Sequence, residues 1–206
     1  MTSTPDDADA DSRTATGVAA IAAARAQGWR LIVEILREPD DALVGRVRNG
    51  DLMRELREST DWLGDESARF IDSLAILDVL ARRSRRRSHE EDRDDLVTEF
   101  RRLFPNGPPS FREHVREMVG LIEAEARAWS AGDVETGKTK RVEQNTLLEA
   151  ELLDVVPAWC VALDERAKAG LYTLIPRLVT SYVSIESGRD FDRALSFGTG
   201  LLSFED

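Results

Sequence analysis

Apolar residues recur every three or four positions along most of the 206-residue chain, and runs of alternating apolar and polar residues are missing. This spacing places apolar side chains on one face of a helix, so it predicts α-helices rather than strands. The predicted helices span about residues 14–36, 41–48, 51–58, 66–81, 96–104, 110–131, 133–156, 171–187 and 191–197. We therefore expect an all-α fold, a single-domain helical bundle of about eight to ten helices.

Proline, glycine and aspartate mark several expected helix boundaries. In the sequence EPDD at residues 38–41, proline suits a first helical turn and aspartate complements the helix dipole. Gly132 suits the left-handed position after a helix, and Asp133 is the expected N-cap of the next one. Gly28 costs about 1 kcal/mol relative to alanine inside a helix and allows a kink there. Pro157 is expected to kink or end its helix.

The segment LVTEFRRLFPNGPPSFREH, residues 96–114, contains the most unusual boundary. Its helical pattern stops at Pro105, a rigid Pro-Asn-Gly-Pro-Pro elbow follows, and the next helix carries His114 in its first turns. Two large aromatic residues, Phe100 and Phe104, stand at the helix end beside this elbow. The arrangement suits the lining of a groove, although plain core packing is the alternative for Phe100 through Phe104.

Acidic residues outnumber basic ones by 39 to 28, which gives a net charge of −11. This balance argues against binding to the phosphate backbone of nucleic acids and against attraction to anionic membranes. We interpret most of the excess as a solvated, self-repelling surface.

The first 13 residues are polar and acidic, so we expect a disordered acidic tail at 1–13 and an all-helical domain over 14–206. This N-terminus lacks the basic and apolar regions of a secretory signal peptide. No apolar run approaches the length that stable membrane insertion requires. The expected location is the cytoplasm.

The sequence RRSRRR at 82–87 is the one basic cluster. It could grip an acidic partner or a phosphate. The alternative is a solvated linker, which we favour because the acidic residues between 90 and 95 neutralise its field. His89 beside the cluster is expected to be exposed.

Residues suited to catalysis or metal binding are scarce. The single cysteine, Cys160, lies among apolar residues and is interpreted as a buried structural thiol. Residues 137–139, Gly-Lys-Thr, lack the upstream glycine and the strand of a phosphate-binding loop. Glu123 and Glu125 are two positions apart and face different directions on a helix, which argues against a metal site with His114. We expect no enzyme activity, no catalytic residue, no cofactor and no metal site.

Four local patterns occur in a familiar order. They are GWRLIVEILREPDDALVGRV, FRRLFPNGPPS, AWSAGDVETGKTKRVEQNTLLEAELLDVVPAW and LYTLIPRLVTSYV. Together they resemble the TorD/DmsD/NarJ family of cytoplasmic chaperones for molybdoenzymes, over about residues 25 to 185. The resemblance implies binding of an apo-molybdoenzyme catalytic subunit, or of its twin-arginine signal peptide, until the molybdopterin cofactor has been inserted and export can begin.

By resemblance, Phe100, Leu103 and Phe104 match the motif that lines the family's binding groove, and Glu113 and His114 match its acid-histidine pair. The connection between these motifs is shorter than usual in the family. Glu151 stands where the family frequently has a histidine. For His114, a structural role is the alternative to a peptide contact.

The implied partner is thus a molybdoenzyme subunit or its signal peptide, bound by a monomer or homodimer, with no nucleic-acid partner. The second hypothesis is an α-helical adaptor or regulatory protein that binds an unrelated partner helix in the same groove. A small enzyme or metal protein is the third.

Overall fold

The computed structural model describes residues 5–167 and 170–188, and this part of the chain contains helices and turns but no strand. Its α-helices are α1 (Pro5–Ile35), α2 (Asp41–Asn49), α3 (Asp51–Thr60), α4 (Ile71–Ser84), α5 (His89–Leu103), α6 (Arg112–Ser130), α7 (Val134–Leu147), α8 (Val156–Asp164) and α9 (Leu174–Ser187). The 3-10 segments η1 (Asp61–Phe70) and η3 (Leu171–Thr173) and the π-helical turn η2 (Leu148–Leu152) connect them. The all-α prediction is confirmed. The predicted helix at 191–197 lies outside the described residues.

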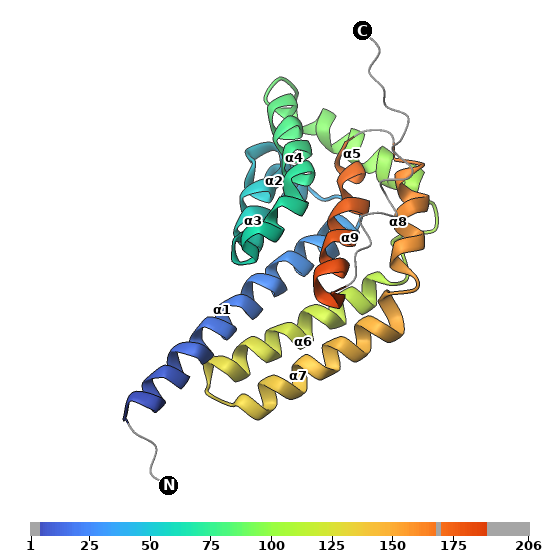
Figure 1. Ribbon diagram of the computed structural model, residues 1–206. Coiled ribbons are helices and arrows are strands. Elements are labelled where there is room, and N and C mark those ends of the chain that lie inside the picture. The colour runs from blue at the N-terminus through green and yellow to red at the C-terminus, as the bar shows by residue number, and fades with distance from the viewer. Residues whose placement is uncertain (1–4, 168–169, 189–206) are drawn as a thin grey trace.

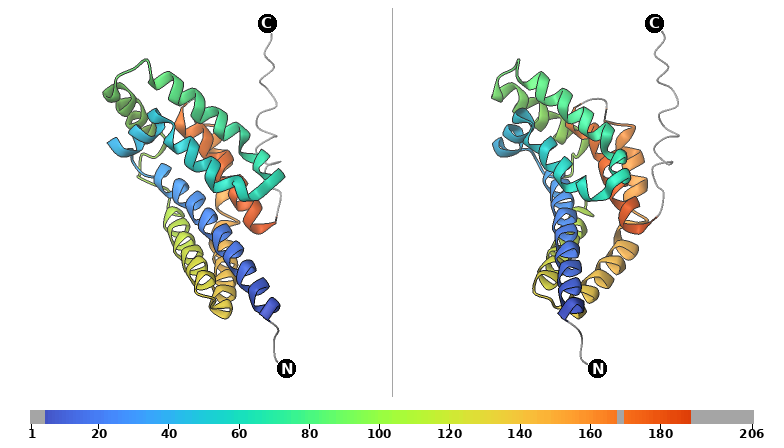
Figure 2. Two further views of the ribbon diagram at one scale, coloured as in Figure 1. Left: turned by 90° about the vertical axis from the view of Figure 1, so that its left-hand side faces the viewer. Right: turned by 60° about the vertical axis from the view of Figure 1, so that its left-hand side comes forward.

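Two groups of helices meet around α9 (Figure 1). The long helices α1, α6 and α7 lie side by side, with α6 packed against both of the others (Figure 2). Helices α2, α3, α4 and α5 pack against one another at the other end of the molecule. Helix α9 contacts α1, α4 and α8, and thereby joins the two groups.

The core is one continuous apolar cluster to which every α-helix except α7 contributes fully buried residues. Helix α9 is its centre, because every residue from Leu174 to Ser184 except Arg177 is buried. A helix with apolar residues on all sides is stable in water only when other helices surround it. The sequence of α9 therefore determines its central position.

Helix α1 begins nine residues earlier than the predicted start at Thr14, so residues 5–13 are helical and not part of a disordered tail. Proline fits the first turn of a helix because its missing N–H has no partner there. The aspartates and alanines that follow Pro5 favour a helix start and its continuation. Residues 1–4 of the predicted tail lie outside the described residues.

Gly28 does not kink α1; it permits a close contact. A Cβ atom at this position would lie 1.9 Å from the hydroxyl oxygen of Tyr182 on α9. That hydroxyl lies 2.9 Å from Ser59 Oγ, so glycine allows α9 to approach α1 and a buried hydrogen bond to form. The free-energy cost of glycine in a helix is thus offset by packing.

The predicted caps are confirmed, whereas two long predicted helices are each divided. Asp40 accepts a hydrogen bond from Leu43 N (2.9 Å) and Asp133 accepts one from Thr136 N (3.0 Å). Residues 66–70 of the predicted helix at 66–81 belong to the 3-10 segment η1, and the α-helix begins only at Ile71. The predicted helix at 133–156 ends at Leu147, and Pro157 lies in the first turn of α8, where it leaves no hydrogen bond unmade.

Candidate functional site

The elbow between α5 and α6 is a tight turn. Phe104 leaves the helix with φ −124° and ψ 63°, and its N–H still bonds the carbonyl of Phe100 at 2.8 Å. Gly107 adopts φ +87°, a left-handed conformation that only glycine adopts readily, and donates to the Phe104 carbonyl at 3.0 Å. The elbow therefore fixes the end of α5 relative to α6.

The aromatic residues at this elbow lie in the core and do not line an open groove. Phe100, Leu103 and Phe104 are 3%, 2% and 7% exposed. The ring of Phe104 stacks on Trp159 at 6.1 Å, and both Phe100 and Phe104 pack on Tyr172. These three predicted site residues are therefore core residues, which was the alternative to the groove prediction.

The other two predicted site residues lie on the solvent side of α6. Glu113 pairs with Arg116 and, at 3.3 Å, with Arg112. His114 Nδ1 lies 3.6 Å from an Oε atom of Glu151 in η2. The structure thus brings His114 close to Glu151, whereas Phe100, Leu103 and Phe104 are buried in the core.

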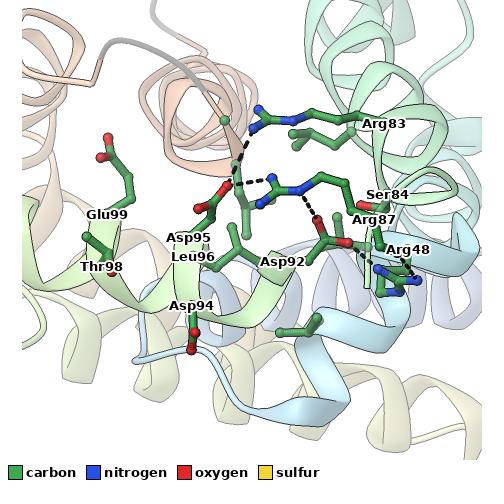
Figure 3. Close-up of a pocket in the computed structure, with 15 residues that line it drawn as sticks. Arg48, Arg83, Ser84, Arg87, Asp92, Asp94, Asp95, Leu96, Thr98 and Glu99 are labelled. Carbon is green, nitrogen blue, oxygen red and sulfur yellow. Dashed lines mark hydrogen bonds and ion pairs between the residues drawn. The ribbon is translucent and has the colours of Figure 1, made fainter. Parts of the chain in front are cut away.

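A cavity of about 360 Å³ lies beside residues 92–99 of α5, between α5, α2, α4 and the segment at Gly170 (Figure 3). Its apolar lining comes from four elements and consists of Val44, Val47, Leu80, Leu96 and Leu171. Its polar lining consists of Arg48, Arg83, Ser84, Arg87, Asp92, Asp94, Asp95, Thr98 and Glu99. We call this cavity the α5 pocket; it combines an apolar wall with a charged rim.

Opposite charges alternate across the rim of the α5 pocket. Asp92 pairs with Arg48 and, at 3.5 Å, with Arg87, while Asp95 lies 2.5 Å from Arg87 Nη1 and 3.4 Å from Arg83 Nη2. Figure 3 shows this row of ion pairs. The hydrogen bond from Arg87 lowers the pKa of Asp95 below its ordinary value. The carboxyl of Asp95 is therefore ionised at neutral pH.

Two further carboxylates of α5 border the pocket but do not pair with the arginines of its rim. Asp94 is exposed and has no hydrogen-bond or ion-pair partner within residues 5–167 and 170–188. Both oxygens of Glu99 accept hydrogen bonds from Arg102, three positions along the same helix, at 2.9 and 2.7 Å. Asp94 points away from Asp95 and Glu99 (Figure 3), so of these two acids only Glu99 lies on the same side of α5 as Asp95.

The spacing of the pocket residues on α5 is a signal that the sequence analysis did not use. Asp92, Asp95, Leu96 and Glu99 follow a three-to-four-residue spacing, so they share one face of the helix. Phe100 and Leu103 point to the core from the same helix. The acidic run was interpreted only as a counterweight to the arginines, and its helical periodicity was overlooked.

A buried ionic network where α1, α6, α7 and α9 meet was also missed. Arg25 is 4% exposed, and its guanidinium donates to Glu125 and Glu186, at 2.8 and 2.7 Å, and to Gln144 at 2.7 Å. Burial alone would lower the pKa of Arg25, but the carboxylates of Glu186 and Glu125 outweigh it and raise that pKa. Arg25 occurs at core spacing between Ala22 and Trp29, which could have identified it as buried.

This network is suited to structure rather than to chemistry. Its arginine is 4% exposed and already bonded to three side chains, so it is not presented to a ligand at the surface. The network holds α1, α6, α7 and α9 in one register, because a shift of one helix would leave a buried charge without its partner.

The thiol of Cys160 is confirmed as buried, with 0% exposure. Burial raises its pKa to about 12, which keeps it protonated and unreactive at neutral pH. Glu123 and Glu125 do face different ways: Glu123 meets Arg30 at the surface at 2.5 Å, whereas Glu125 joins the buried network. No three metal-ligating side chains converge in the part of the chain that the structure describes.

None of the helices described here combines the length and apolarity that crossing a membrane would need. Comparisons of the chain with protein-family models, with characterised proteins and with solved structures found no match in any of the three.

Proposed function

We propose that this chain is a chaperone that binds the apo catalytic subunit of a molybdoenzyme through its twin-arginine signal peptide, and that the peptide occupies the α5 pocket. The observation that carries the proposal is the pocket itself, in which an apolar wall meets the acidic face of α5. The ordered sequence motifs supply the client class, and the pocket supplies a surface of matching chemistry.

The chemistry of a twin-arginine signal peptide is complementary to this pocket. Such a peptide presents two guanidinium groups followed by an apolar stretch. Carboxylates bind guanidinium groups through short, charge-assisted hydrogen bonds, which Asp95 and Glu99 on the pocket-facing side of α5 can accept. The apolar stretch can pack on Leu80 and Leu96, as amphipathic segments do in apolar grooves.

Under this proposal the elbow supports the site instead of contacting the peptide. Phe100 and Leu103 anchor the C-terminal half of α5 in the core, so the preceding turns of the helix present Asp95 and Leu96 at a fixed position. The family motif would then contribute through the placement of α5 rather than by direct contact.

The proposal is tested by calorimetric titration with a synthetic peptide that contains an Arg-Arg pair and an apolar stretch. We expect binding, and at least about tenfold weaker binding when the pair is changed to Gln-Gln, because two charge-assisted contacts are lost. The double variant Asp95→Asn, Glu99→Gln should weaken binding of the Arg-Arg peptide and leave the Gln-Gln peptide unaffected.

Glu117→Gln is the matched control, since Glu117 is an exposed acid on α6 away from the pocket. It should bind both peptides as the unaltered protein does. Equal binding of the two peptides would favour an adaptor for apolar helices. Failure of the protein to capture any molybdoenzyme subunit from a host that makes one would contradict the chaperone proposal.

A further inference from the structure

Two arginines of the basic cluster already occupy the acidic rim of the α5 pocket. Arg83 and Arg87 stand four positions apart, and both reach from the end of α4 toward α5 (Figure 3). Both meet Asp95, at 3.4 and 2.5 Å, and Arg87 also meets Asp92 at 3.5 Å. The chain thus supplies its own arginine pair at the place where a client's pair would bind.

We propose that Arg83 and Arg87 form an internal latch, which holds the acidic rim in the free protein and is displaced by the arginine pair of the client. This inference rests on the proposed function, because it assigns regulation to the same pocket. The latch would make the empty pocket less attractive to isolated cations. A ligand must supply two guanidinium groups together with an apolar segment to displace it.

The ion pairs of the latch differ in strength in a way that permits exchange. Arg83 and Asp95 are 57% and 56% exposed, so their contact is screened by water and opens readily. Arg87 is held more firmly, since it is 23% exposed and also bonds the Glu91 carbonyl at 3.2 Å. Displacement can therefore begin at Arg83 and proceed to Arg87.

Release of Arg87 does not leave a buried carboxylate without a partner. Asp92 is 9% exposed, but Arg48 also pairs with it. Arg48 is fixed independently by the carbonyls of Ser88 and Arg87, at 2.9 and 3.1 Å. The rim thus keeps its buried ion pair while Asp95 is transferred to the incoming arginine.

The same cluster provides a matched control pair. Arg85 and Arg86 are exposed, and their side chains make no hydrogen bond or ion pair to any described residue. Changing them to glutamine removes the same charge from the same segment without opening the latch. Any general electrostatic effect on a cationic peptide is therefore shared by both double variants.

The test compares Arg-Arg peptide binding by the protein, by Arg83→Gln, Arg87→Gln and by Arg85→Gln, Arg86→Gln. The latch variant should bind about tenfold more tightly than the control variant. Arg83→Gln alone should show part of that gain; because its pair is exposed, this variant retains the fold even if Arg87→Gln impairs it. Equal affinities for the two double variants would overturn the latch.

A second measurement needs no peptide. In the free protein, nitrogen-15 NMR of arginine side chains should show slower exchange of the Arg87 Nε–H than of the Arg86 Nε–H, because only Arg87 is held by carboxylates. Equal exchange rates would overturn the latch by themselves. If exchange differs but no form of the protein binds the peptide, the proposed function fails while the internal contact stands.

Discussion

Arg25 shows how one residue can determine the arrangement of four helices. Its guanidinium contacts side chains of α6, α7 and α9 from its position on α1. Arg30, five positions further along α1, also pairs with a glutamate of α6, but at the surface. The two arginines therefore allow the effect of burial on an ion pair to be measured within one helix pair.

Arg25→Met should lower the free energy of unfolding by about 3–5 kcal/mol, because it leaves Glu125 and Glu186 buried with fewer counter-charges. Arg30→Met should lower it by no more than about 1 kcal/mol, since its ion pair is partly solvated. Urea denaturation of both variants measures the difference. Equal effects would contradict a structural role for the buried network.

Gly28 is a second residue whose importance only packing reveals. Gly28→Ala should destabilise the protein by about 1–3 kcal/mol, because the added methyl group would overlap Tyr182 and force α9 away from α1. Gly17→Ala, in the same helix but with no neighbour within 4 Å, should instead stabilise it by up to about 1 kcal/mol. Thermal unfolding of the pair checks this prediction, and a stabilising Gly28→Ala would refute the contact.

At the scale of elements, the helix starts depend on carboxylates that must stay ionised. The backbone hydrogen bond from Leu43 lowers the pKa of Asp40 below its ordinary 3.8. Hydrogen bonds from the side chain and backbone of Thr136 lower the pKa of Asp133 in the same direction. A lowered folded-state pKa means that each carboxylate contributes stability above pH 3.8 and loses it as the pH falls through the lowered value.

Asp40→Asn combined with Asp133→Asn should therefore retain stability near pH 7, because asparagine caps helices about as well as aspartate. Below pH 4 the variant should lose less stability than the unaltered protein, since it has no cap carboxylate to protonate. Denaturant titrations between about pH 7 and pH 2.5 give the two slopes. Glu117→Gln, which removes an exposed acid that caps nothing, is the control, and parallel slopes in all three proteins would contradict this account.

Most elements could be predicted from sequence because their signals are local. Apolar spacing identified the helices, and Asp40, Asp133 and Gly132 marked their ends. The 3-10 form of residues 66–70 and the π-helical turn at 148–152 were missed, because these segments keep helical apolar spacing while the backbone changes its hydrogen-bond pattern. Local spacing does not distinguish such variants from an α-helix.

At the scale of the whole molecule, the fold class followed from periodicity, whereas the candidate site did not. Phe100 and Phe104 looked like groove residues because they stand at a helix end beside a rigid turn, yet Trp159 and Tyr172 cover them. Those neighbours are more than 50 residues away in the sequence. The α5 pocket likewise forms only where α2, α4, α5 and the segment at Gly170 converge, so no single stretch of sequence contains it.

The central claim is that the α5 pocket, not the elbow, receives a peptide with an arginine pair and an apolar stretch. Methyl NMR of the protein with labelled leucine and valine, titrated with the Arg-Arg peptide, tests this claim most directly. We predict shifts at Leu80 and Leu96 in the pocket and none at Leu103, the last residue of α5 before the elbow. Shifts confined to Leu103, or no shifts at all, would contradict the account.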